Sequence, residues 1–207
     1  ELDLIVGNMW PGTFFLNEEF TIANLKSQRE QAEYKIIHLA THGEFVSGGA
    51  DRSYIQFWDQ KLWLNQLREL RLNQPPVELL VLSACTTAVG DEKAELGFAG
   101  LAVQAGVKSA MASLWYVSDA GTLGLMTTFY NALTATPIKA EALRQSQLAM
   151  LNGQVRLENG YLLSQTNIST RRGDISTPVP QELARQNPVD LSHPFYWAGF
   201  TLIGSPW

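Results

Sequence analysis

Cysteine is almost missing from this sequence, which has a single one, Cys85, among 207 residues. One thiol cannot form a disulfide within the chain. Free cysteines are typical of a reducing compartment, or of a thiol that is kept for chemistry. The N-terminus shows no secretory signal peptide either. We therefore expect a cytoplasmic protein.

An excess of basic residues and long apolar runs are also missing. The net charge of −5 and the pI of about 5.2 leave no basic footprint for nucleic acid or for an anionic membrane. The most apolar stretch, residues 96–117, is interrupted by Gly97, Gly100 and Gly106 and carries Lys108. A buried helix followed by a buried strand explains it better than a membrane span. We expect neither nucleic acid nor membrane as a partner.

Neither a serine-hydrolase motif nor a metal-binding histidine pair is supported by the sequence. No Gly-x-Ser-x-Gly elbow occurs, which argues against a serine hydrolase. His38 and His42 are four residues apart, a metal-binding spacing on a helix but a separation of about 13 Å on a strand. We expect no metal and no cofactor, and we expect His38 to be buried in a sheet. His193, which precedes a proline, is interpreted as a cap or structural contact.

Two segments have the same pattern, a short apolar run followed by polar and small residues. Residues 35–40 form a short apolar run that ends in Thr41, His42 and Gly43, and residues 78–84 form another that ends in Cys85. Both runs have the length and composition of buried strands. Ligands and chemistry collect beyond the carboxyl ends of the strands in an open parallel sheet. The cysteine and one of the three histidines therefore both fall where such sheets place active sites.

A thiol and an imidazole together can perform nucleophilic catalysis. A free thiol with a pKa of about 8.5 is mostly protonated at neutral pH, and a nearby imidazole can take up its proton and later protonate a leaving amine. The backbone N–H groups of Gly43 and Cys85 are the natural oxyanion-hole pair. A lone cysteine after a strand is more often a small core residue, and a lone histidine more often a satisfied polar group. The spacing of His42 and Cys85 alone leaves both interpretations open.

Strands and helices are expected to alternate along one domain, residues 1–207, because 45% hydrophobic content suffices for one substantial core. The abrupt start at Glu1 favours a piece of a longer protein. Polar, proline-containing sequence predicts a mobile excursion within residues 152–192, after an Asn159-Gly160 hairpin turn. The expected elements are a strand at 2–6, a helix capped by Asn17 to about Glu33, a hairpin at 54–63, strands ending at Ala40, Ala84 and Leu114, helices at 95–106, 118–135 and 137–151, and a last strand at 198–203.

Five segments resemble the CHAT family: 38–43 (HLATHG), 82–87 (LSACTT), 96–101 (LGFAGL), 113–119 (SLWYVSD) and 193–200 (HPFYWAGF). CHAT domains are caspase-like, are often attached to tetratricopeptide repeats and are similar to the protease domain of separases. The resemblance implies an α/β caspase–hemoglobinase fold, a mainly parallel sheet flanked by helices, with His42 and Cys85 as the catalytic dyad. It also implies that the family's first strands lie upstream of Glu1.

Departures from the caspase pattern limit what the resemblance implies about specificity. His42 and Cys85 are 43 positions apart, near the roughly 50 of caspases. The caspase Gln-Ala-Cys signature is absent, because Ser83 precedes Ala84, so aspartate-specific cleavage is not expected. The corresponding segment of separases lines the pocket for the residue before the cut, which makes Asp119 a candidate for binding a basic side chain. An acidic residue in the first turn of a helix capped by Ser118 is an equally good interpretation of Asp119.

Further candidates have plain alternatives. Ser83 and Trp115 are additional candidates for the substrate pocket. The pair Arg171-Arg172 fits a processing site, but also a flexible loop kept soluble by charge. Asp91, Glu92 and Glu95 flank the cysteine loop and are candidates for reaching the substrate, with a solvated loop as the default interpretation. Asn167-Ile168-Ser169 matches a glycosylation sequon, but the sequence offers no secretory context for it.

Two functions therefore compete. The first is a cysteine endopeptidase that cleaves a protein or peptide substrate, with upstream domains of the parent protein, such as tetratricopeptide repeats, choosing the target. The second is a catalytically inactive, caspase-like interaction module. The presence of both His42 and Cys85 favours the enzyme, because an interaction module needs neither.

Overall fold

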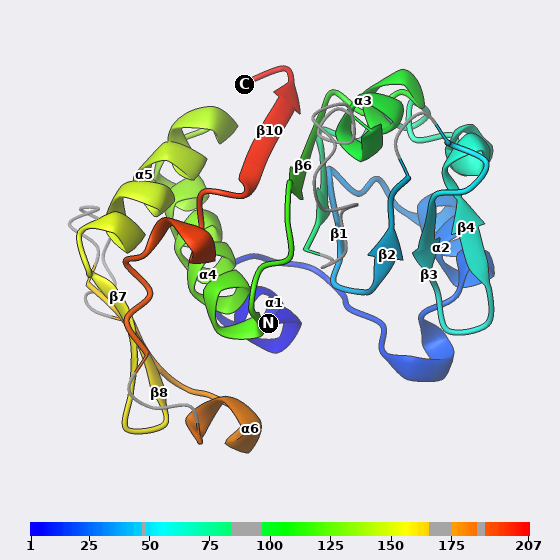
Figure 1. The fold of residues 1–207 in the computed structure, drawn as a ribbon. Coiled ribbons are helices and arrows are strands. Elements are labelled where there is room, and N and C mark those ends of the chain that lie inside the picture. Colours follow the sequence, from blue (N-terminus) through cyan, green and yellow to red (C-terminus); the bar gives the residue numbers. More distant parts are fainter. Residues whose placement is uncertain (47–48, 84–96, 166–174, 186–188) are drawn as a thin grey trace. The chain divides into compact units, whose positions relative to one another are not determined.

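A computed structural model of the chain describes residues 1–46, 49–83, 97–165, 175–185 and 189–207 (Figure 1). Contacts group the chain into two compact units. The sheet unit comprises Phe15–Tyr116 and Phe200–Ser205. The helical unit comprises Glu1–Phe14, Val117–Gly199 and Pro206–Trp207.

The sheet unit contains a four-stranded sheet with the order β1-β5-β6-β10. Strands β1 (Ile36–Leu39), β5 (Leu79–Leu82) and β6 (Ser109–Ser113) are parallel neighbours, and β10 (Phe200–Gly204) pairs antiparallel with β6 (Figure 1). Helices flank this sheet. The predicted α/β fold with a mainly parallel sheet is therefore confirmed, and the apolar runs predicted from the sequence contain its strands β1 and β5.

One face of this sheet carries the main core of the unit. Alternate residues of β1 and β5 point into it, and helix α3 (Gly97–Gln104) packs on β6 and β10 with small residues such as Ala99 and Ala102. Small side chains allow a helix to lie close to a sheet. The strand residues in this core are Ile37, Leu39, Leu80, Leu82, Ala110 and Ala112.

A second, three-stranded antiparallel sheet has the order β2-β3-β4. It consists of β2 (Gly43–Glu44), β3 (Tyr54–Gln56) and β4 (Lys61–Trp63), followed by the 3₁₀ helix η2 (Leu64–Leu70). The predicted hairpin at 54–63 is confirmed, and its loop is closed by the Phe57 N–H bond to the Gln60 oxygen (2.9 Å).

The helix before β1 begins later than the sequence suggested. Thr21, not Asn17, caps α2 (Ile22–Gln31), because its Oγ1 accepts the Asn24 N–H (3.1 Å). Asn17 instead opens a 3₁₀ helix, η1 (Asn17–Glu19), with a φ of 50°. Arg29 is buried and ties α2 to the chain before β5 by donating to the backbone oxygens of Arg71 and Pro75.

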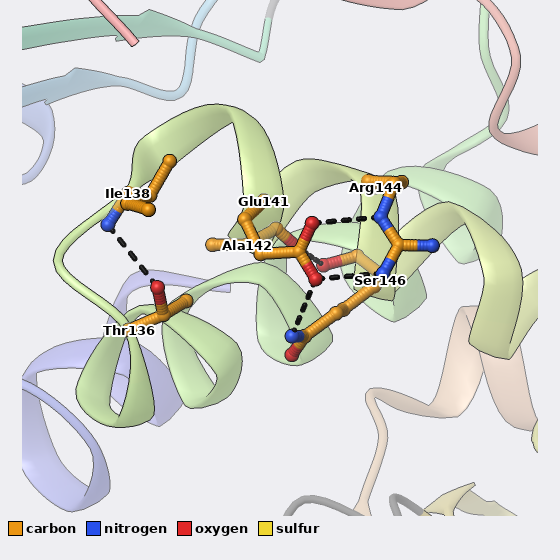
Figure 2. Close-up of polar contacts among 7 residues, drawn as sticks. Thr136, Ile138, Glu141, Ala142, Arg144 and Ser146 are labelled. Carbon is orange, nitrogen blue, oxygen red and sulfur yellow. Dashed lines mark hydrogen bonds and ion pairs between the residues drawn. The ribbon is translucent and has the colours of Figure 1, made fainter. Parts of the chain in front are cut away.

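The helical unit is built on α4 (Asp119–Ala135) and α5 (Lys139–Leu151), which pack along one another. Ser118 caps α4 as predicted, with its Oγ accepting the Gly121 N–H (3.2 Å). Figure 2 shows the first turns of α5, where Arg144 donates two hydrogen bonds of 2.7 Å to the Glu141 carboxylate.

The N-terminal segment corrects a sequence prediction. Residues 2–6 were expected to form a strand, but Leu2–Asn8 forms the helix α1. Helical bonds run from the Ile5 N–H to the Glu1 oxygen and from the Met9 N–H to the Ile5 oxygen. An apolar run of five residues does not distinguish a strand from a helix, and burial of Ile5 stabilises the helix here.

The segment 152–192 is more regular than its composition indicates. The Asn159-Gly160 turn is confirmed, with φ values of 51° and 78°, and joins β7 (Val155–Glu158) to β8 (Tyr161–Ser164). Among the described residues that follow, part of the predicted excursion forms regular secondary structure. There β9 (Ile175–Pro178) pairs with β8, and the short helix α6 (Gln181–Ala184) buries Leu183. Pairing with β8 supplies backbone hydrogen bonds that a polar segment can make without a core of its own.

Candidate active site

The two strands that precede the candidate dyad run side by side in the same direction. Leu39 of β1 lies opposite Leu82 of β5, and the Ser83 N–H bond to the Leu39 oxygen (3.2 Å) carries the pairing one residue further. Parallel strands present their carboxyl ends at one sheet edge. The segments that begin at Ala40 and Ser83 therefore leave the sheet at the same edge.

The backbone around His42 is held by β3. Thr41 Oγ1 donates to the Gln56 oxygen (2.7 Å), and the Gln56 N–H donates to the His42 oxygen (2.8 Å). The His42 side chain itself is exposed. The structure thus fixes the main chain at His42 and leaves the imidazole accessible to solvent.

Gly43 is buried, and close packing requires glycine there. A Cβ on Gly43 would lie 3.0 Å from the Tyr54 oxygen and 3.3 Å from the Phe45 ring. A side chain at Gly43 would push β2 away from β3. The oxyanion-hole role of Gly43 remains a prediction.

His38 and Ser83 form a polar pair that sequence reasoning missed. His38 Nε2 and Ser83 Oγ are 2.9 Å apart, and Ser83 is buried. His38 lies in β1, a strand of the sheet as predicted, and is half-buried. It lies opposite Val81, and residues two apart on a strand share a face, so Ser83 comes within its reach. The parallel register of the two strands was the signal that could have revealed this pair.

Two candidate pocket residues, Trp115 and Asp119, follow β6 in the sequence, and no strand pairing among the described residues relates them to His42. Trp115 is half-buried, and Asp119 is an exposed residue in the first turn of α4, where the helix dipole favours an acid. Asp119 belongs to the helical unit and His42 to the sheet unit. Pocket roles for Trp115, Asp119 and Ser83 stay predictions.

Several candidates lie outside the described residues. Cys85 is one of them, so the structure gives no distance from its thiol to the His42 imidazole. The others are Asp91, Glu92, Glu95, the sequence Asn167-Ile168-Ser169, Arg171 and Arg172.

The third histidine has a structural contact. His193 Nδ1 accepts the Phe195 N–H (3.2 Å) and caps the 3₁₀ helix η3 (Pro194–Tyr196), which confirms the interpretation of His193 as a cap. Within the described parts of the chain, no group of three or more His, Cys, Asp or Glu residues is arranged to hold a metal ion. No helix in those parts is long and apolar enough to cross a membrane.

Comparison with known families agrees with the motifs. The family model of the CHAT domain matches residues 1–205. The chain belongs to the CHAT family. This CHAT domain contains all five motif segments in order, and its match extends over both contact units. No match was found among curated proteins. The caspase-like character of the family favours a protease-like module.

Proposed function

We propose that this CHAT domain is a cysteine endopeptidase in which Cys85 is the nucleophile and His42 the general base and acid. The observation that carries the proposal is the register of β1 and β5. Leu39 lies opposite Leu82, and His42 and Cys85 each follow their strand residue by three positions. Equal spacing beyond neighbouring parallel strands favours a meeting of the two side chains at one sheet edge.

The chemistry is acyl transfer through a thioester. Cys85 passes its proton to the His42 imidazole, and the thiolate attacks the carbonyl carbon of the scissile peptide bond. The C–N bond then breaks, and the imidazolium protonates the departing amine. Water, deprotonated by His42, hydrolyses the thioester and restores the thiol. The N–H groups of Gly43 and Cys85 would stabilise the oxyanion of the tetrahedral intermediate. Loss of one such donor typically slows catalysis by about 10²–10³-fold.

Neighbouring residues support this assignment. The bonds from Thr41 and Gln56 hold the backbone at His42, which limits the conformations that the imidazole must lose on binding substrate. The His38–Ser83 contact anchors the end of β5, two residues before Cys85. We propose that Ser83 and Trp115 line the substrate pocket and that Asp119 favours Arg or Lys before the scissile bond. A fluorogenic peptide panel that gave the same preference with Asp119→Asn would remove Asp119 from the pocket.

The setting of the enzyme is part of the proposal. Because the CHAT match is continuous over residues 1–205, we propose that both contact units act as one domain. Upstream domains of the parent protein, such as tetratricopeptide repeats, would select a protein substrate. A reducing compartment such as the cytoplasm would keep the only cysteine in its thiol form.

Covalent labelling tests the dyad directly. A peptide acyloxymethyl ketone that reacts with activated thiols should label the wild-type protein at Cys85 and leave Cys85→Ala unlabelled. His42→Ala should react at least about 100-fold more slowly, because the base that activates the thiol is gone. His193→Ala is the matched histidine control, since His193 caps η3, and it should label at the wild-type rate.

The competing function has its own signature in the same experiment. Equal labelling of wild type and His42→Ala, together with no cleavage of any protein by the wild type, would identify an inactive interaction module. Cleavage that survives in Cys85→Ala would show that another residue is the nucleophile.

A further inference from the structure

The small sheet β2-β3-β4 has one buried and one solvent-facing side. The row of Gly43, Ile55 and Leu62 is buried. Residues of the adjacent rows are exposed or half-buried, and we call them the outer face. They are Glu44, Tyr54 and Trp63 in one row, and Gln56 and Lys61 in the next.

His42 shares this outer face. The Gln56 N–H bond to the His42 oxygen places His42 opposite Gln56, in continuation of the β2–β3 register. Exposure alternates accordingly, with His42 and Glu44 exposed and Gly43 buried. Strands lie about 4.8 Å apart and residues two apart on a strand about 6.8 Å, so Tyr54 and Trp63 lie roughly 8–12 Å from His42 between Cα atoms. An extended peptide covers that distance in two to four residues.

The outer face already holds a cation. Lys61 Nζ lies 3.7 Å from the centre of the Tyr54 ring and 5.7 Å from that of Trp63. The two rings meet edge to face with centroids 5.5 Å apart. Aromatic faces attract ammonium and guanidinium groups in this distance range. The aromatic pair therefore has the geometry of a cation site, occupied by an exposed side chain of the chain itself.

The surrounding charge favours a basic ligand. Glu44, an exposed carboxylate, lies next to Tyr54 in the same row. The net charge of −5 adds a long-range attraction for basic peptides. Displacing Lys61 returns its ammonium to water, where a flexible exposed lysine is well solvated, so the exchange costs little.

We propose that Tyr54 and Trp63 form a subsite for a lysine or arginine side chain of the peptide substrate, two to four residues from the scissile bond. The incoming cation replaces Lys61 Nζ on the Tyr54 ring, and Glu44 pairs with it. The subsite's part in catalysis rests on the proposed function, whereas its binding of a cation does not. The two claims can therefore be tested separately.

Binding is measured without cleavage on Cys85→Ala protein. The indole N–H of Trp63 is assigned in a ¹⁵N-labelled sample by its loss in Trp63→Phe. Titration with N-acetyl-arginine methylamide should shift this signal, whereas the neutral isostere N-acetyl-citrulline methylamide should not. The indole of Trp58, an exposed tryptophan in the β3–β4 loop, should not respond. No shift at Trp63, or equal shifts with both compounds, would overturn the subsite.

Substitutions sharpen the assignment. Lys61→Met removes the internal competitor and should tighten binding of the arginine derivative about two- to fivefold, the range of one exposed cation–π contact. Tyr54→Leu should weaken it by a similar factor, and the matched control Trp58→Leu should leave it unchanged. Weaker binding in Lys61→Met would mean that Lys61 does not compete for the rings, and would overturn the exchange.

Cleavage assays then separate the two proposals. Peptides with arginine at the second, third or fourth position from the cut are compared with citrulline versions. Tyr54→Leu should raise KM about two- to fivefold for one arginine peptide and for no citrulline peptide. Cleavage that does not distinguish arginine from citrulline at any of these positions overturns the subsite in catalysis. A response of Trp63 without cleavage of any peptide supports the cation site and overturns only the proposed protease.

Discussion

Two separate features of the structure bear on Gly43. It follows the candidate base His42, and its surroundings leave no room for a side chain. The Tyr54 oxygen and the Phe45 ring close in from two sides. The sequence suggested for Gly43 only a backbone N–H donor of the oxyanion hole. The structure adds a packing reason that holds whether or not the protein is an enzyme.

Gly43→Ala should therefore destabilise the protein by about 1–3 kcal/mol, the usual cost of overpacking a closed site. Chemical denaturation measures the difference in the free energy of unfolding. Gly100→Ala is the matched control, because nothing lies within 4 Å of a Cβ at Gly100 in helix α3. That change should stabilise the protein by up to about 1 kcal/mol, since alanine is the better helix former. Equal effects of the two substitutions would contradict the packing argument.

Among the elements, α5 shows how helix-surface contacts respond to pH. Hydrogen bonds from the Arg144 guanidinium and the Gln145 amide lower the pKa of Glu141 from 4.5 to about 2 (Figure 2). A carboxyl group with a lower pKa in the folded state stabilises the fold above its unfolded pKa. That contribution is lost as the pH falls from about 4.5 through 2.

Glu141→Gln should lower Tm by about 1 °C at pH 7, because contacts on an exposed helix surface are screened by solvent. The difference from wild type should stay constant above pH 5 and shrink between pH 4.5 and pH 2. Thermal melts followed by circular dichroism over this range check it. Glu30→Gln, an exposed glutamate of α2 with no ion pair to another described residue, is the control. A difference for Glu141→Gln that persists at pH 2 would contradict the assignment.

For the whole molecule, strand pairing decides what a cut in the segment between β8 and β9 would do. Arg171 and Arg172 belong to that segment by sequence. Strands β9 and β10 follow this segment in the sequence, whereas β8 and β6 precede it. β9 pairs with β8, and β10 pairs with β6 over five residues. Two fragments would therefore remain joined by two ladders of backbone hydrogen bonds.

Self-processing after Arg171 or Arg172 should give two bands in a denaturing gel and a single species of unchanged size by gel filtration. Mass spectrometry of the fragments identifies the cut. The Cys85→Ala protein, incubated in parallel, should stay intact. An intact wild-type chain, or equal nicking in both proteins, would show that the arginine pair is not a self-cleavage site.

What the sequence by itself determined is mostly local, together with the family. Ser118 predicted the cap of α4, and Asn159-Gly160 predicted a hairpin turn. Both features are local, because the cap is a hydrogen bond to a residue three positions away and the turn depends on the backbone angles of the two residues themselves. The apolar runs at 35–40 and 78–84 predicted neighbouring buried strands, and five motifs identified the CHAT family. The expected meeting of His42 with Cys85 stays a prediction.

Tertiary structure decided the remaining features, because these features depend on strand register and on contacts between segments that are distant in the sequence. The run at 2–6 is apolar enough for either kind of element, and packing of Ile5 made it a helix. Only the pairing of β1 with β5 brings Ser83 to His38, and only the β2-β3-β4 register places Lys61 over Tyr54 on the face of His42. A register shift of one residue would reverse every one of these faces. Local sequence does not encode register, because register is set by the fit of whole strands and their loops.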